Sequence, residues 1–138
     1  MRIIGIDLHG TITPHDFYNP DMKLPWLLFC FLFLFTCLLS RPKKEIVKKL
    51  QILKNEGCKI IIVSARPIQL TWLTKFWLVW RHVPYDKLFC VGFGKGTKER
   101  KLRIINEEKI ETFIDDSVSC IEFLEKHSVN AMKDLISV

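Results

Sequence analysis

The chain has 138 residues, 49% of them apolar, which fits one folded domain with its own hydrophobic core. Ten Phe and four Trp exclude a disordered chain, and the low Gly and Pro content, six of each, excludes collagen-like and low-complexity classes. The net charge of +6 indicates an anionic partner such as a phosphate, a nucleic acid or a lipid headgroup.

Apolar runs along the chain predict strands and helices in alternation. Residues 2–8 are expected to form a buried strand that ends in a turn at Gly10 and Thr11. A helix is expected between Ser40 as N-cap and Gly57 as C-cap. Further strands are predicted at 59–63, 87–92, 112–115 and, weakly, 129–132, and further helices at 68–82, 97–107 and 118–127. This pattern predicts an α/β fold, a three-layer open parallel sheet with helices on both faces.

An uncharged segment of 17 residues, Leu24 to Ser40, follows the first strand. It is not expected to be a signal peptide, because a complete strand and turn precede it. As a helix it would span about 25 Å, short of the roughly 30 Å of a bilayer core. A single membrane span is also excluded because the strands on either side must share one sheet. A shallow insertion, a re-entrant hairpin or a helix buried against protein remain, within a single domain of residues 1–138 that has 14–40 as an insertion.

A second aromatic segment lies at 68–82. Trp72, Phe76 and Trp80 share one helical stripe, and Leu73 and Trp77 share its neighbour. A core position, a homo-oligomer interface and a membrane surface all fit such a stripe. The net charge of +5 between Arg41 and Lys59 favours contact with anionic headgroups.

The five cysteines are odd in number and contain no CxxC pair, so neither a disulfide framework nor a zinc ribbon is expected. Reduced, buried thiols fit this pattern better. We therefore expect a reducing, cytoplasmic environment, with peripheral membrane contact as an option through 24–39 and 72–80.

Polar residues follow the four main predicted strands. They are Asp7, His9, Gly10 and Thr11 after the first strand, Ser64 and Arg66 after the second, Lys95 and Lys98 after the third, and Asp115 and Asp116 after the fourth. The carboxyl ends of parallel strands meet at one edge, so these residues are expected to converge. Clustered carboxylates suit Mg²⁺, and a lysine with a hydroxyl suits a phosphoryl group. Each residue taken alone also fits a strand end or a helix cap.

These motifs resemble those of the haloacid dehalogenase (HAD) superfamily. "IIGIDLHGTIT" is similar to its first motif, "KIIIVSAR" to its second and "FIDDS" to its fourth, and a lysine between the last two supplies the third. The motifs stand in family order, and the resemblance covers nearly the whole chain except 14–40. It implies a HAD-like Rossmannoid fold, with 24–39 in the position of a small cap.

The resemblance also implies roles for individual residues. Asp7 would be the nucleophile that forms an aspartyl-phosphate, and Ser64 with a lysine would bind the phosphoryl oxygens. The lysine is expected to be Lys98 first, with Lys95 and Lys101 behind it. Mg²⁺ would be held by Asp7, the backbone carbonyl of His9 and Asp116, with Asp115 in or near the outer shell. Thr11 would support the loop by hydrogen bonding.

His9 departs from the family pattern, which has a second Asp at this position as the acid/base group. An imidazole titrates near neutral pH and can serve both steps, but it removes a negative charge beside the metal. The predicted function is a Mg²⁺-dependent phosphohydrolase acting on a phosphomonoester. A catalytically weak scaffold, oligomeric or membrane-associated, is the alternative. A nucleic-acid module is disfavoured because no stacking or groove-reading motif accompanies the positive charge.

Overall fold

Parallel strands form one sheet in the computed structural model, which describes residues 1–13 and 25–135. The strands are β1 (Ile3–Ile6), β2 (Lys59–Ser64), β3 (Lys87–Cys90), β4 (Thr112–Ile114) and β5 (Ala131–Met132), and the sheet order is β3-β2-β1-β4-β5. All four pairings in the sheet are parallel. The predicted open parallel sheet of the α/β class is therefore confirmed.

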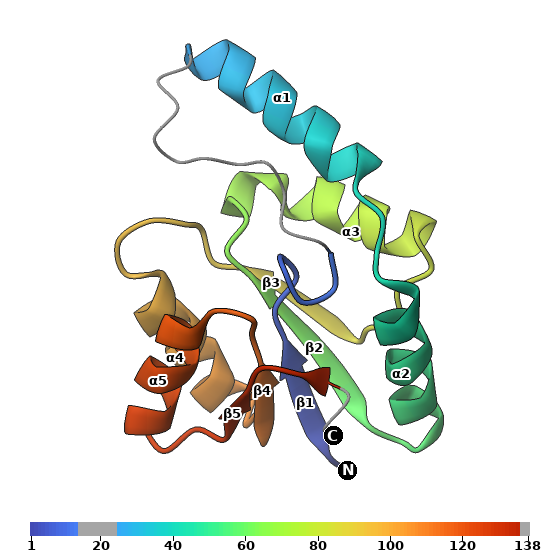
Figure 1. Cartoon of the computed structure of the whole chain (residues 1–138), viewed down its shortest axis with the longest axis vertical. Helices are drawn as coiled ribbons and strands as arrows, with labels where there is room; N and C mark the ends of the chain where they lie inside the picture. Colours follow the sequence, from blue (N-terminus) through green and yellow to red (C-terminus); the bar gives the residue numbers. More distant parts are fainter. Residues whose placement is uncertain (14–24, 136–138) are drawn as a thin grey trace.

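Two helical layers cover the sheet (Figure 1). One face lies against α2 (Lys44–Asn55) and α3 (Thr71–Trp80), the latter preceded by the short 3-10 helix η1 (Ile68–Leu70). The other face lies against α4 (Thr97–Glu107) and α5 (Val118–Lys126). Alternation along β2 separates the two cores, because Ile60 and Ile62 join the first cluster and Ile61 and Val63 the second.

The start of α2 differs from the prediction. Its first residue is Lys44 and not a residue next to Ser40, because residues 40–43 are engaged elsewhere. The Ser40 carbonyl accepts a 3.1 Å hydrogen bond from Trp77 Nε1. The Lys43 N–H donates to the carbonyl of Ile12 at 2.8 Å. The end of α2 is as expected, since Gly57 follows it with a φ of 84° that favours glycine.

The apolar segment forms helix α1 (Trp26–Leu39), which lies against α3 at the opposite end of the molecule from the N-terminus (Figure 1). Residues 14–24 of the predicted insertion lie outside the described part of the chain. In α3 the two predicted stripes differ: Leu73 and Trp77 are buried, whereas Trp72, Phe76 and Trp80 are at least half exposed. Among the described helices, none has the length and apolar character required to cross a bilayer.

Candidate functional site

The carboxyl edge of the sheet holds a cluster of buried polar side chains. Asp7 directly follows β1, and its N–H donates to the carbonyl of Ile114 in β4 at 2.8 Å. Asp115 directly follows β4, and its N–H donates to the carbonyl of Met132 at 3.1 Å. Ser64 is the last residue of β2, and it is fully buried like its apolar neighbours in that strand. The sheet register therefore fixes the backbone of all three residues.

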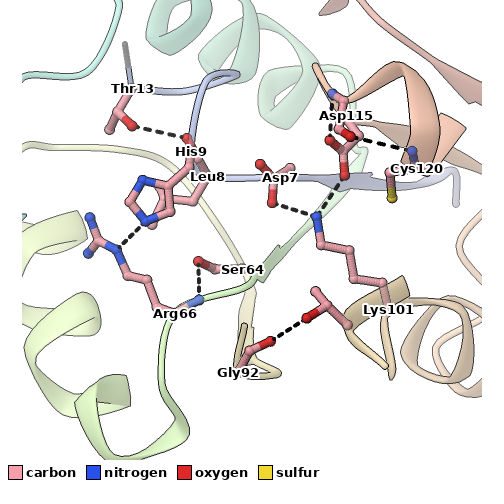
Figure 2. A network of polar contacts seen from close by, with 12 residues as sticks. Asp7, Leu8, His9, Thr13, Ser64, Arg66, Gly92, Lys101, Asp115 and Cys120 are labelled. Atoms are coloured by element: carbon pink, nitrogen blue, oxygen red, sulfur yellow. Dashed lines mark hydrogen bonds and ion pairs between the residues drawn. The ribbon is translucent and has the colours of Figure 1, made fainter. Parts of the chain in front are cut away.

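Lys101 connects the two carboxylates (Figure 2). Its Nζ lies 2.9 Å from Asp7 Oδ1 and 2.7 Å from Asp115 Oδ2, and its side chain is only 7% exposed. The sequence prediction placed Lys98 first at this position, but the structure places Lys101 there, with its side chain reaching the edge from α4. Lys98 lines a pocket of about 300 Å³ that Lys101, Gly94 and Ser117 also line, and Lys95 is exposed.

Burial dominates the electrostatics of this cluster. It raises the pKa of Asp7 to about 6, although Lys101 acts in the opposite direction. The pKa of Lys101 is raised above its usual value, because the attraction of Asp7 and Asp115 outweighs the desolvation of its ammonium group. The two directions are compatible because one lysine is shared by two carboxylates. In the metal-free protein the Asp7 carboxylate is therefore less stable than it would be in water.

The acidic residues are close enough to share a cation. Oxygens of Asp7, Asp115 and Asp116 lie within 4.8 Å of one another. Asp115 Oδ1 also accepts the Ser117 N–H at 2.9 Å. Gly10, with a φ of 76°, passes so close to the Asp116 carboxylate that a side chain at residue 10 would collide with it. Three carboxylates beside one lysine form a set of oxygen donors that suits Mg²⁺.

His9 points away from Asp7 and toward Arg66 (Figure 2). Arg66 Nε donates to His9 Nε2 at 3.1 Å, and the Arg66 backbone N–H donates to Ser64 Oγ at 3.2 Å. Arg66 is 2% exposed and its guanidinium lies 5.5 Å from the centre of the Trp77 ring. Within residues 1–13 and 25–135 its Nη2 has no hydrogen-bond partner. Arg66 was identified as a residue at a strand end but received no role, since nothing in the sequence pairs it with His9.

The loop after β1 is not supported by Thr11 as expected. The hydroxyl of Thr11 is buried and has no hydrogen-bond partner in the described part of the chain. The hydroxyl of Thr13 donates to the carbonyl of Leu8 at 3.3 Å. The hydrogen bond that was expected to support this loop is therefore made by Thr13.

The sequence of the chain is similar to that of a curated protein. No family model matches the chain. Over 90 residues it is 31% identical to a putative nucleotidase from Bacillus cereus, in an alignment that covers 64% of this chain and 46% of that protein. The chain therefore spans about half the length of that relative.

Solved structures match more of the chain at lower identity. A chain of the Pnkp1/Rnl/Hen1 RNA repair complex has a TM-score of 0.70 and 17% identity, covering 96% of this chain and 42% of that one. A haloacid dehalogenase-like protein from Streptococcus pneumoniae has a TM-score of 0.65 and 10% identity, covering 96% and 84%. D,D-heptose 1,7-bisphosphate phosphatase from B. bronchiseptica, complexed with magnesium and phosphate, has a TM-score of 0.63 and 8% identity, covering 98% and 94%. Together with the ordered motifs and the sheet, these likenesses show that the chain has the fold of the haloacid dehalogenase superfamily.

Proposed function

We propose that this chain is a Mg²⁺-dependent phosphohydrolase that acts on a phosphomonoester through an aspartyl-phosphate. The proposal rests on one observation. Asp7 and Asp115 both form ion pairs with the buried Lys101, beside Asp116, at the carboxyl edge of the sheet. The fold comparison supports it, because one similar structure is a phosphatase complexed with magnesium and phosphate.

Asp7 is the proposed nucleophile. Its carboxylate oxygen attacks phosphorus, the bond from phosphorus to the leaving oxygen breaks, and that oxygen takes up a proton. Water then attacks the aspartyl-phosphate and releases inorganic phosphate, which regenerates the carboxylate. Because this reaction needs Asp7 as a carboxylate, its pKa of about 6 in the metal-free protein predicts a loss of rate below that pH when Mg²⁺ is subsaturating.

Lys101 and Ser64 are the proposed ligands of the phosphoryl oxygens. The ammonium of Lys101 lies 2.9 Å from the nucleophilic carboxylate, next to the place that the negatively charged phosphoryl oxygens would take during transfer. Ser64 Oγ accepts the backbone N–H of Arg66, so its own hydroxyl proton remains available for a phosphoryl oxygen. We therefore assign the lysine role to Lys101 in place of Lys98.

Mg²⁺ would be held by Asp7, Asp116 and the backbone carbonyl of His9. Asp115 is already bound to Lys101 and to the N–H of Ser117, which suits a residue that orients the others from the outer shell. When bound, the ion would supply positive charge to the phosphoryl group and lower the cost of keeping Asp7 ionised.

A catalytically weak binding protein, oligomeric or membrane-associated, is the second candidate, and the position of His9 favours it. In this arrangement Nε2 of His9 accepts the hydrogen bond from Arg66, so that nitrogen carries no proton for a leaving group. His9 must leave Arg66 before it can serve as the acid or base at Asp7. Slow hydrolysis of the aspartyl-phosphate would give a burst of leaving group close to one equivalent of enzyme, followed by a slow phase.

Release of p-nitrophenol from p-nitrophenyl phosphate tests both candidates. We expect Mg²⁺-dependent release that Asp7→Asn abolishes and that Lys101→Met lowers by about 10²–10³-fold, the usual effect of removing a group that stabilises transition-state charge. Lys98→Met is the matched control and should remain within about twofold, because its charge lies outside the carboxylate cluster. A larger loss in Lys98→Met than in Lys101→Met would overturn the lysine assignment. If the wild type releases no p-nitrophenol, even as a burst, the phosphohydrolase proposal is wrong and the binding-protein proposal remains.

A further inference from the structure

Helices α1 and α3 lie at the end of the molecule away from the N-terminus (Figure 1), and both carry exposed apolar side chains. The two helices contact each other, and Arg81 Nη2 joins them by donating to the carbonyl of Leu38 at 3.1 Å. We call this surface the apolar face. Its residues, each at least 50% exposed, are Leu27, Phe31, Phe35 and Leu39 of α1 and Trp72, Phe76, Val79 and Trp80 of α3. Large exposed apolar surfaces of this kind mark binding sites.

The two segments that form the apolar face carry basic residues and no acidic ones. No acidic residue occurs between Leu24 and Lys44 or between Ala65 and Tyr85. The same stretches contain exposed basic residues, among them Arg41, Lys44 and Lys75. Exposed apolar side chains on segments that also carry basic residues are complementary to an anionic bilayer, where acyl chains lie beneath negative headgroups.

We propose that the apolar face docks on the surface of an anionic lipid bilayer. Trp72 and Trp80 are 67% and 50% exposed, and their rings combine an apolar body with an N–H donor that favours the headgroup level. The guanidinium of Arg81 lies 4.2 Å from the centre of the Trp80 ring, beside the same surface. Because α1 has only 14 residues, it is too short to cross a bilayer, and we expect both helices to lie in the plane of the membrane–water interface.

A second copy of the chain fits this surface less well. A two-fold interface brings the same surface of both copies together, so the basic residues of the segments that form the apolar face would be brought near their own copies. The segments that form the patch supply no acidic residue to neutralise them. Opposed like charges lower affinity, whereas anionic headgroups would neutralise the same residues.

Docking in this way has a consequence for the candidate site, although it does not depend on the proposed function. The strands run toward the end of the molecule where α1 lies, so the carboxyl edge with Asp7 is on the side of the bilayer (Figure 1). A phosphomonoester carried on a lipid would then reach the site without leaving the membrane surface.

Cosedimentation of the purified chain with vesicles tests the proposal. We expect binding to phosphatidylcholine vesicles that contain phosphatidylglycerol and at least about tenfold weaker binding to pure phosphatidylcholine. Replacing Phe31 and Phe35 by Ser should lower binding by about tenfold or more, because two exposed aromatic rings no longer enter the bilayer. Ile52→Ser with Val118→Ser is the matched control, since both residues are more than half exposed but lie on α2 and α5. Equal losses in the two double variants would overturn the docking surface.

Tryptophan fluorescence and sedimentation equilibrium complete the test. Trp72 and Trp80 should shift to shorter emission wavelengths on anionic vesicles, and brominated lipid should quench them. Lys75→Gln with Arg41→Gln should weaken binding to the anionic vesicles, with Lys126→Gln as an exposed control on α5. A stable dimer that shields Trp72 without vesicles, or an absence of binding to anionic vesicles, would overturn the proposal whether or not the chain hydrolyses phosphate.

Discussion

Replacing Asp7 by Asn should stabilise the fold of the metal-free protein while removing its proposed activity. Asp7 is 4% exposed and shares its one lysine with Asp115. Burial raises its pKa to about 6, from the usual 3.8 of an aspartate. The folded state therefore holds the Asp7 proton more tightly than the unfolded state does. Asn resembles the protonated carboxyl group and carries no charge to desolvate.

The size of this effect follows from the pKa difference. A group with a raised folded-state pKa stabilises the folded state in its protonated form, fully so below the unfolded pKa. As pH rises from 3.8 toward about 6 the unfolded chain releases this proton first, and stability is lost. A shift of roughly two pH units corresponds to about 3 kcal/mol. Asp7→Asn should therefore raise the free energy of unfolding by about 3 kcal/mol above pH 7 and by little near pH 4.

Urea unfolding of the wild type and Asp7→Asn in EDTA, between about pH 4 and pH 7.5, measures this difference. Glu125→Gln is the matched control, because it neutralises an exposed carboxylate of α5 and should change stability little at any pH. Adding Mg²⁺ should stabilise the wild type and leave Asp7→Asn nearly unchanged. A variant that is less stable than the wild type at pH 7.5, or a gain that does not vary with pH, would refute the reasoning.

Two further predictions concern the proposed metal site. Gly10→Ala should lower Mg²⁺ affinity by about tenfold or more in calorimetry, because a side chain at residue 10 displaces the Asp116 carboxylate. Gly57→Ala is the control, since its φ of 84° imposes a similar backbone strain with open space around the added carbon; equal losses in both variants would contradict this explanation. Mg²⁺ affinity of the wild type should also rise by about tenfold per pH unit up to about pH 6 and then level off, because the ion displaces the proton of Asp7. A flat affinity across that range would show that Asp7 is not a ligand.

The sheet was predictable from the sequence because its strands are short, continuous apolar runs. They lack the three- and four-residue spacing of apolar residues that a helix shows. β2 consists of Lys59–Ser64 and matches the predicted run at 59–63 with one further residue. Helix α4 spans Thr97–Glu107, the predicted range. The start of α2 was missed because the prediction used only local cap chemistry. The residues before it bond to α3 and to the loop after β1, which are contacts between distant parts of the chain.

The lysine of the site shows a limit of a different kind. Lys95, Lys98 and Lys101 stand at three-residue intervals, and each suits a helical or loop position after β3. Which ammonium reaches Asp7 depends on where α4 packs against the sheet and on its rotation about its own axis. Ile104 and Ile105 fix that rotation by entering the core between α4, α5 and the sheet. A long-range packing contact therefore decides a choice that spacing alone left open.

His9 and Arg66 together change the charge balance of the site. The guanidinium of Arg66 is buried and contacts three neutral groups, which are His9 Nε2, Thr74 Oγ1 and the Trp77 ring. An Asp at residue 9, as in the family pattern, would neutralise this cation. With His9 the edge carries one negative charge fewer, so it attracts a phosphoryl group more strongly and a divalent cation less strongly. In the proposed reaction His9 would therefore weaken the acid/base step and favour retention of phosphate, and both effects would slow turnover.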